Sequence, residues 1–88
     1  MMKKGTTSTG FTFEINEAEL DNMEFLDALS EATENVLQFS KVVKMLLGES
    51  QRKALYDHLR VEGGKVPIES VSSAVYEIME LASEETKN

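Results

Sequence analysis

The residues that could do chemistry are few, and none has the neighbours that a reaction would need. His58 is the single histidine and the chain has no cysteine. A metal site or a nucleophile–base pair built on His58 would therefore lack its second group. Gly63-Gly64-Lys65 shares its glycines and lysine with phosphate-binding loops, but it lacks the upstream glycine and the Ser or Thr after the lysine. We predict no catalytic residue, no cofactor-binding residue and no metal ligand, and hence a protein that is not an enzyme.

Two serines are candidates for carrying a prosthetic group. An acyl carrier protein is also short, acidic and four-helical, but it needs Asp-Ser-Leu at a helix start so that the serine can hold the phosphopantetheine arm. The candidates here are Glu49-Ser50-Gln51 and Glu69-Ser70-Val71. Neither matches, so we predict no cofactor of this kind.

Charge is unevenly distributed along the chain, whose net charge is −7. Residues 14–34 hold eight carboxylates and no base, whereas residues 35–65 hold six bases and three acids. The overall acidity argues against direct nucleic-acid binding, which needs clustered Lys and Arg. Either these charges are solvated helix faces, or the two blocks attract each other within one monomer or between neighbouring copies.

Attraction between copies would make the protein a homo-oligomer. The segment 11–15 adds to this hypothesis, because its alternation of apolar and polar residues is typical of a half-buried strand, and one strand must pair with something or lie extended over the helices. The candidate self-association residues are Phe11, Phe13, Glu17, Glu19, Asp21, Glu24, Asp27, Lys41, Lys44, Arg52 and Lys53.

The 88 residues are enough for one small domain. We predict a flexible leader over residues 1–10, a single helical domain over 11–82 and a frayed tail over 83–88. No run approaches the roughly 20 apolar residues of a membrane span, so no membrane contact is expected. The absence of cysteine suits a reducing interior such as a bacterial cytoplasm.

Helical periodicity predicts an all-α fold, a small bundle of about four short helices with a short extended N-terminal segment. The first helix covers about 17–33, with a break near Asp21-Asn22, and the second runs from the cap Asn35 to Leu47. Gly48 is expected to end the second helix in a left-handed conformation. A third helix covers about 49–59, and a fourth begins at Pro67.

Three methionines, Met23, Met45 and Met79, fall in predicted helices. Methionine adapts its shape to varied apolar partners, so these residues are candidates for binding a client protein. The simpler interpretation is that each one fills the core.

The ordered pattern along the chain resembles the tail assembly chaperones of long-tailed phages, closest to the versions in phages and prophages of Gram-positive bacteria. The residues that carry this resemblance span about 9–82. They are Thr9-Gly10-Phe11-Thr12-Phe13-Glu14-Ile15, the acidic helix, Lys44-Met45-Leu46-Leu47-Gly48-Glu49-Ser50-Gln51, Leu55, His58-Leu59-Arg60, Gly63-Gly64-Lys65-Val66-Pro67 and the closing amphipathic helix.

The resemblance implies an α-helical protein of the bacterial host cytoplasm that is absent from the mature virion. It implies two partners: the tape measure protein, which the chaperone binds and keeps soluble, and the tail tube protein, whose subunits it helps to recruit. Many members are made in a short and a frameshifted long form, and this chain would be the short form.

A different class of function remains open from the residues alone. The acidic first helix would also suit an acidic adaptor, or an inhibitor that mimics DNA and occupies a basic protein. Such a mimic needs carboxylates spaced along an exposed face. The basic block over residues 35–65 weakens this alternative.

Overall fold

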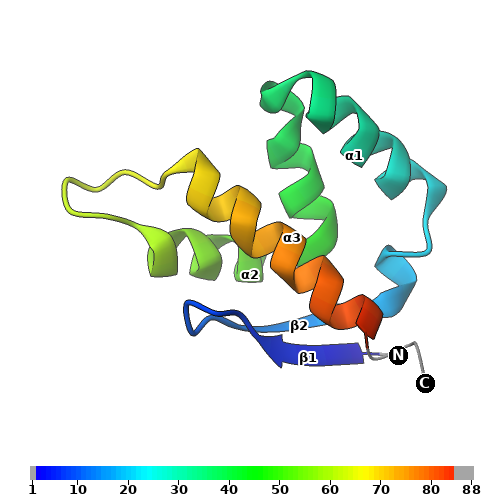
Figure 1. Cartoon of the computed structure of the whole chain (residues 1–88), viewed down its shortest axis with the longest axis horizontal. Helices are drawn as coiled ribbons and strands as arrows, with labels where there is room; N and C mark the ends of the chain where they lie inside the picture. Colours follow the sequence, from blue (N-terminus) through cyan, green and yellow to red (C-terminus); the bar gives the residue numbers. More distant parts are fainter. Residues whose placement is uncertain (1, 85–88) are drawn as a thin grey trace.

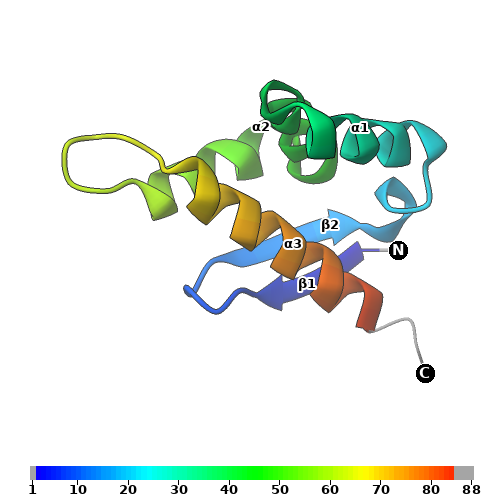
Figure 2. The ribbon, with the colours of Figure 1, turned by 45° about the horizontal axis from the view of Figure 1, so that its top comes forward.

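The computed structural model describes residues 2–84 and has extents of 42 × 28 × 19 Å. Its elements in chain order are strands β1 (Met2–Thr6) and β2 (Thr12–Asn16), the 3-10 turn η1 (Glu17–Glu19), helix α1 (Met23–Glu34), the 3-10 turn η2 (Val36–Gln38), and helices α2 (Phe39–Leu59) and α3 (Ile68–Glu84). Helices α2 and α3 pack on the β1–β2 hairpin, and α1 lies beyond α2, away from the hairpin (Figures 1 and 2).

The prediction of an all-α bundle was wrong, because the described chain forms an α+β domain. Residues 2–6, expected to be a flexible leader, form β1 and pair antiparallel with β2 in the register Met2↔Asn16 to Thr6↔Thr12. Segment 11–15 was correctly predicted to be extended, and its partner is the leader itself. A two-stranded hairpin is marginal alone in water, so the helices that cover it supply its stability.

Long-range hydrogen bonds fix the hairpin loop. The Ser8 N–H donates to Glu77 Oε2 (2.7 Å) and the Ser8 hydroxyl bonds Oε1 of the same side chain (3.1 Å). From the end of α2, the Nε2–H of His58 donates to the Thr9 backbone oxygen (2.9 Å). Side chains of α3 and of the end of α2 therefore hold the tip of the hairpin loop.

One face of the hairpin points into the core and the other faces solvent. Phe13 and Ile15 are buried on the inner face, where Gly5 lies opposite Phe13. A Cβ at Gly5 would stand 2.7 Å from Cζ of the Phe13 ring. The ring therefore packs directly over the glycine backbone, which explains an apparently unhelpful glycine within a strand.

A single core joins the hairpin to the three helices. Its buried apolar members are Phe11, Phe13, Ile15, Phe25, Ala28, Val42, Val43, Leu46, Leu47, Leu55, Val71, Ala74, Val75, Ile78 and Ala82. The closing helix is predicted to be amphipathic, and its apolar side is confirmed, since Val71, Val75, Ile78 and Ala82 are all buried.

Asparagine side chains begin the helical segments, as the sequence indicates for Asn16 and Asn35. The Oδ1 atoms of Asn16, Asn22 and Asn35 each accept a backbone N–H two residues on, at 3.0 Å. Asn22 caps α1 after the predicted break, and Asn35 caps η2, so α2 proper starts only at Phe39. This cap satisfies one of the free N–H groups of a helix start.

Gly48 divides α2 into two halves. Its φ of 77° confirms the predicted positive value, but its ψ of 175° lies in the extended region that only glycine visits readily. The predicted second and third helices thus join through a kink rather than a connecting turn.

The ends of α3 differ slightly from expectation. It starts at Ile68, one residue after Pro67, and continues through Ser83 to Glu84, so the first part of the predicted frayed tail is helical. Residues 85–88 of that tail lie outside the described residues. Across residues 2–84, no helix is both long enough and apolar enough to cross a bilayer.

Candidate protein-binding surfaces

The groups that could do chemistry are used structurally. The His58 ring lies 5.8 Å from that of Phe11 and, through its bond to Thr9, ties α2 to the hairpin loop. Within the described part of the chain, no three His, Cys, Asp or Glu side chains gather closely enough to hold a metal ion. The surfaces best suited to binding a partner are apolar.

The first surface, which we call the apolar groove, is a hollow of about 330 Å³. It is lined by Val36, Leu37, Phe39, Ser40, Tyr56, Val66, Ile68 and Val71. Turn η2 and the start of α2 supply four of these residues, and the start of α3 faces them. Leu37 is 81% exposed and Ile68 is 64% exposed, and with the exposed Val36 they belong to one apolar surface rather than standing singly.

Local structure explains why the groove is open. Because Asn35 starts a separate 3-10 turn, Val36 and Leu37 precede the first regular turn of α2 instead of joining its buried stripe. Val36 is exposed, although helical spacing after the predicted cap at Asn35 would place it on the buried side of the second helix. The adjacent apolar residues Val36 and Leu37, directly after the cap Asn35, could have signalled this exposure, because neighbouring residues of a helix cannot both face the same core.

The second surface, which we call the methionine face, is a hollow of about 400 Å³ at the start of α1. Its apolar residues are Leu20, Met23, Phe25, Leu26, Leu29 and Met79. Met23 and Leu26 are 67% and 54% exposed. The structure thus brings together two of the three methionines that the sequence singled out. Met45 lies elsewhere on α2, half-buried against the core, as the simpler interpretation expects.

The acidic and basic blocks do not pair within the monomer. In residues 2–84, no ion pair joins a carboxylate of 14–34 to a cation of 35–65. Among residues 2–84, the ion pairs of the acidic block are with the leader, through Lys3–Glu17 (3.7 Å) and Lys4–Glu14 (3.8 Å). Two interpretations of the charge blocks therefore stay open: solvated helix faces, and attraction between copies.

The predicted self-association residues fall into different environments. Phe11 and Phe13 are buried in the core of the monomer, so their part in self-association stays an untested prediction. The acidic side chains Glu24 and Asp27 are exposed on α1, as are Lys41, Lys44 and Lys53 on α2. Glu17 is engaged by Lys3, Asp21 lines the hollow of the methionine face, and Glu19 ends the 3-10 turn η1.

Arg52 is already committed within its own helix. It bonds Glu49 at 2.6 Å, and its guanidinium carbon lies 5.5 Å from the centre of the Tyr56 ring. The hydrogen bond from Arg52 lowers the pKa of Glu49, and the same bond raises the pKa of Arg52. Within residues 2–84, Lys41, Lys44 and Lys53 of α2 form no ion pair of this kind.

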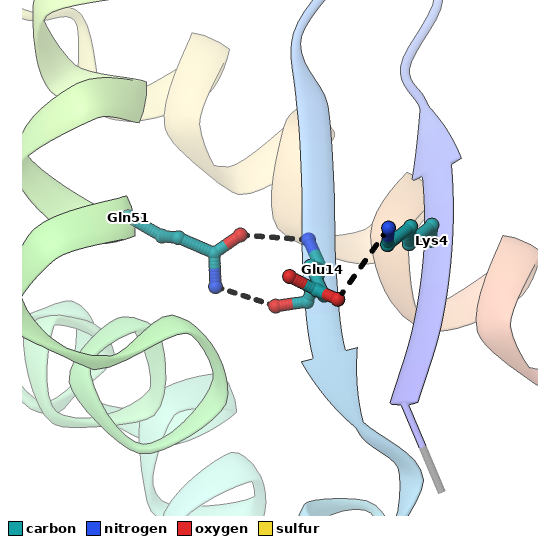
Figure 3. Close-up of polar contacts among 3 residues, drawn as sticks. All are labelled: Lys4, Glu14 and Gln51. Atoms are coloured by element: carbon teal, nitrogen blue, oxygen red, sulfur yellow. Dashed lines mark hydrogen bonds and ion pairs between the residues drawn. The ribbon is translucent and has the colours of Figure 1, made fainter.

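The outer edge of β2 is also occupied. The side-chain amide of Gln51 bonds both backbone groups of Glu14 (Figure 3). Strand β2 pairs with β1 on one side, and on the other side Gln51 bonds the backbone groups of Glu14. The pairing partner that segment 11–15 needs is thus supplied within the monomer, and its role in self-association stays a prediction.

Comparisons with protein-family models, with curated proteins and with solved structures find no match to this chain. The arguments about function accordingly rest on the residues themselves and on the two apolar surfaces.

Proposed function

We propose that this chain is a phage tail assembly chaperone that binds the tape measure protein, keeps it soluble and helps to recruit tail tube subunits to it. The observation that carries the proposal is the open apolar groove with Leu37 and Ile68 at its surface. The resemblance of residues 9–82 to this family supports it as well. On this proposal the protein is not an enzyme, acts in the host cytoplasm and is absent from the mature virion.

The groove suits a helical client. A tape measure protein exposes apolar helix stripes, and an amphipathic helix places residues at i, i+3, i+4 and i+7 into such a groove. A hollow of about 330 Å³ holds only a few side chains, so each contact is weak. Many copies bound along one long rod make the coating strong through avidity. Met23 and Met79 add an adaptable second surface for clients of varied sequence.

Solubility on co-expression tests the proposal. The chain is co-expressed with a tape measure protein, and the soluble fraction of that client is measured with wild type, Leu37→Glu and Tyr76→Glu. Tyr76 is an exposed residue of α3 outside both hollows, so it is the matched control. We expect wild type and the control to keep the client soluble and Leu37→Glu to fail. Equal performance of all three, or no effect of wild type, would contradict the proposal.

The acidic adaptor or DNA-mimic alternative is favoured by one observation. Four carboxylates of α1, namely Glu24, Asp27, Glu31 and Glu34, are exposed and make no ion pair with any residue in 2–84. A mimic depends on these charges and not on the groove. Pull-down of a basic DNA-binding protein that is lost in Glu24→Gln/Glu31→Gln but kept in Leu37→Glu would favour this alternative.

A further inference from the structure

We propose that, without a client, the apolar groove of one copy takes helix α1 of a second copy, which docks through its exposed Met23 and Leu26. The inference builds on the proposed function only in using the same groove. It requires no client and can be tested on the purified chain alone.

The exposed side chains of α1 and the lining of the groove are both apolar, so they are suited to pack against each other. Met23 and Leu26 stand three residues apart on α1, so they lie one above the other on the same side of the helix. Both are more exposed than large apolar side chains of a small domain usually are. The groove that would receive them is lined almost entirely by apolar side chains and is wide enough for two or three of them.

The charges around the two surfaces have opposite signs. Ser40 of α2 lines the groove; Lys41 follows it directly, and Lys44 lies one turn after it. Glu24 and Asp27 flank Met23 and Leu26 on α1. No ion pair within residues 2–84 uses any of these four charges, so each remains available to a neighbour.

The end of α1 also favours a cationic neighbour. Glu31 and Glu34 lie in its last turns, where no basic residue accompanies them. The negative end of the helix dipole makes carboxylates unfavourable there. Lysines of a neighbouring groove that approached this helix would relieve that repulsion.

The two surfaces share no residue, so the contact is heterologous rather than two-fold. Each copy can offer its groove and its α1 at once, and the assembly grows head to tail or closes into a ring. One helix of 12 residues buries little area, so each junction is weak and forms in proportion to concentration. A client helix that enters the groove displaces the neighbour, which couples disassembly to client binding.

Sedimentation velocity on the purified chain is the test. We expect the average mass to rise above 9.8 kDa with concentration at about 0.05 M salt and to fall toward that of one chain at about 0.5 M, where ionic screening is short-ranged. A chain that stays monomeric at every concentration and salt overturns the inference, as does an oligomer that ignores salt.

Two single-sided variants test the head-to-tail geometry. Leu26→Glu damages α1 and keeps the groove, whereas Leu37→Glu damages the groove and keeps α1. Each alone should remain monomeric, while an equal mixture should form pairs and nothing larger, because one intact junction remains. Tyr76→Glu should associate like wild type. A mixture that stays monomeric overturns the head-to-tail geometry. If circular dichroism shows that Leu26→Glu is unfolded, Met23→Ser takes its place.

The outcomes separate this inference from the proposed function. Leu26→Glu should lose self-association while its groove stays intact. Because Leu26 also lines the methionine face, the client readout is taken from Leu37→Glu and its control Tyr76→Glu. If wild type is monomeric but Leu37→Glu loses the client, the inference fails and the chaperone proposal stands. If the chain self-associates as expected but solubilises no client, the proposed function fails and the inference stands.

Discussion

Gln51 acts on Glu14 as a neighbouring strand would. The Glu14 N–H donates to Gln51 Oε1 at 2.7 Å, and Gln51 Nε2 donates to the Glu14 backbone oxygen at 2.5 Å (Figure 3). The same nitrogen lies 3.2 Å from the Leu47 backbone oxygen, one turn earlier in α2. A helix side chain thus fastens the sheet to α2 and satisfies backbone groups that would otherwise face solvent.

Gln51→Glu should destabilise the domain by about 1–2 kcal/mol at neutral pH, because the introduced carboxylate cannot donate to the Glu14 oxygen. Protonation restores a donor, so the pKa of the new group is higher in the folded than in the unfolded state. The deficit relative to wild type should therefore shrink as pH falls through the carboxyl range. Urea unfolding of both proteins at each pH measures it. Ser50→Ala is the control, and a deficit independent of pH would contradict the assigned bonds.

Gly5→Ala should cost about 1–3 kcal/mol, because its Cβ would stand 2.7 Å from the Phe13 ring in a filled core. Adding Phe13→Leu shortens the opposing side chain and should recover part of that loss. Thermal unfolding of the two single variants and the double variant gives the coupling. Strictly additive effects would mean that the ring and the glycine do not meet. Thr6→Ala, on the outer face, should change little.

Gly48→Ala should destabilise by about 1–3 kcal/mol through its backbone alone, since φ is 77° and nothing lies within 4 Å of the added Cβ. Chemical denaturation measures the loss. A neutral or stabilising result would show that α2 can run straight through this position. Ser50→Ala, two residues on, supplies the matched control for adding a helix-favouring side chain nearby.

The Glu49–Arg52 pair predicts a specific titration. Because the hydrogen bond and charge of Arg52 lower the pKa of Glu49, this interaction stabilises the fold above the pKa of the unfolded chain. The stabilisation is lost as pH falls through the lower folded-state value. Carbon-detected NMR titration should show the pKa of Glu49 rising in Arg52→Gln and moving less in Lys53→Gln, whose charge contributes least. Equal shifts in the two variants would contradict the pairing.

Local signals were sufficient for several features of the helices, but not for the start of α2, which is Phe39 rather than the residue after Asn35. The asparagine caps, the break near Asp21-Asn22, the positive φ of Gly48 and the buried stripe of α3 all follow from residue type and spacing. Each depends on atoms within one or two turns of the chain, which is why the sequence predicts them.

Strand β1 could not be found in this way. What holds it lies outside the strand itself. The Phe13 ring packs over Gly5, helix α3 contacts β1, and Ser8 in the hairpin loop is bound to Glu77, 69 residues away. Without those contacts, residues 2–6 have the composition of a polar leader.

The candidate surfaces were predicted only in part. Met23 and Met79 were named, but the groove was missed, because helical spacing puts Val36 on the buried side of the following helix, whereas it lies in the separate turn η2 and is exposed. Periodicity alone does not reveal that a 3-10 turn precedes the helix.

The position of α1 outside the main helical layer has a dynamic consequence. It packs chiefly on α2 and η2, whereas the hairpin is held by α2, α3 and the bonds of Ser8 and His58. Deuterium exchange should therefore release the amide protons of α1 before those of α3 and β2, as a subglobal opening. Helix α1 would then detach while the hairpin stays folded. A uniform exchange rate over α1, α3 and β2 would instead show that the domain opens only as a whole.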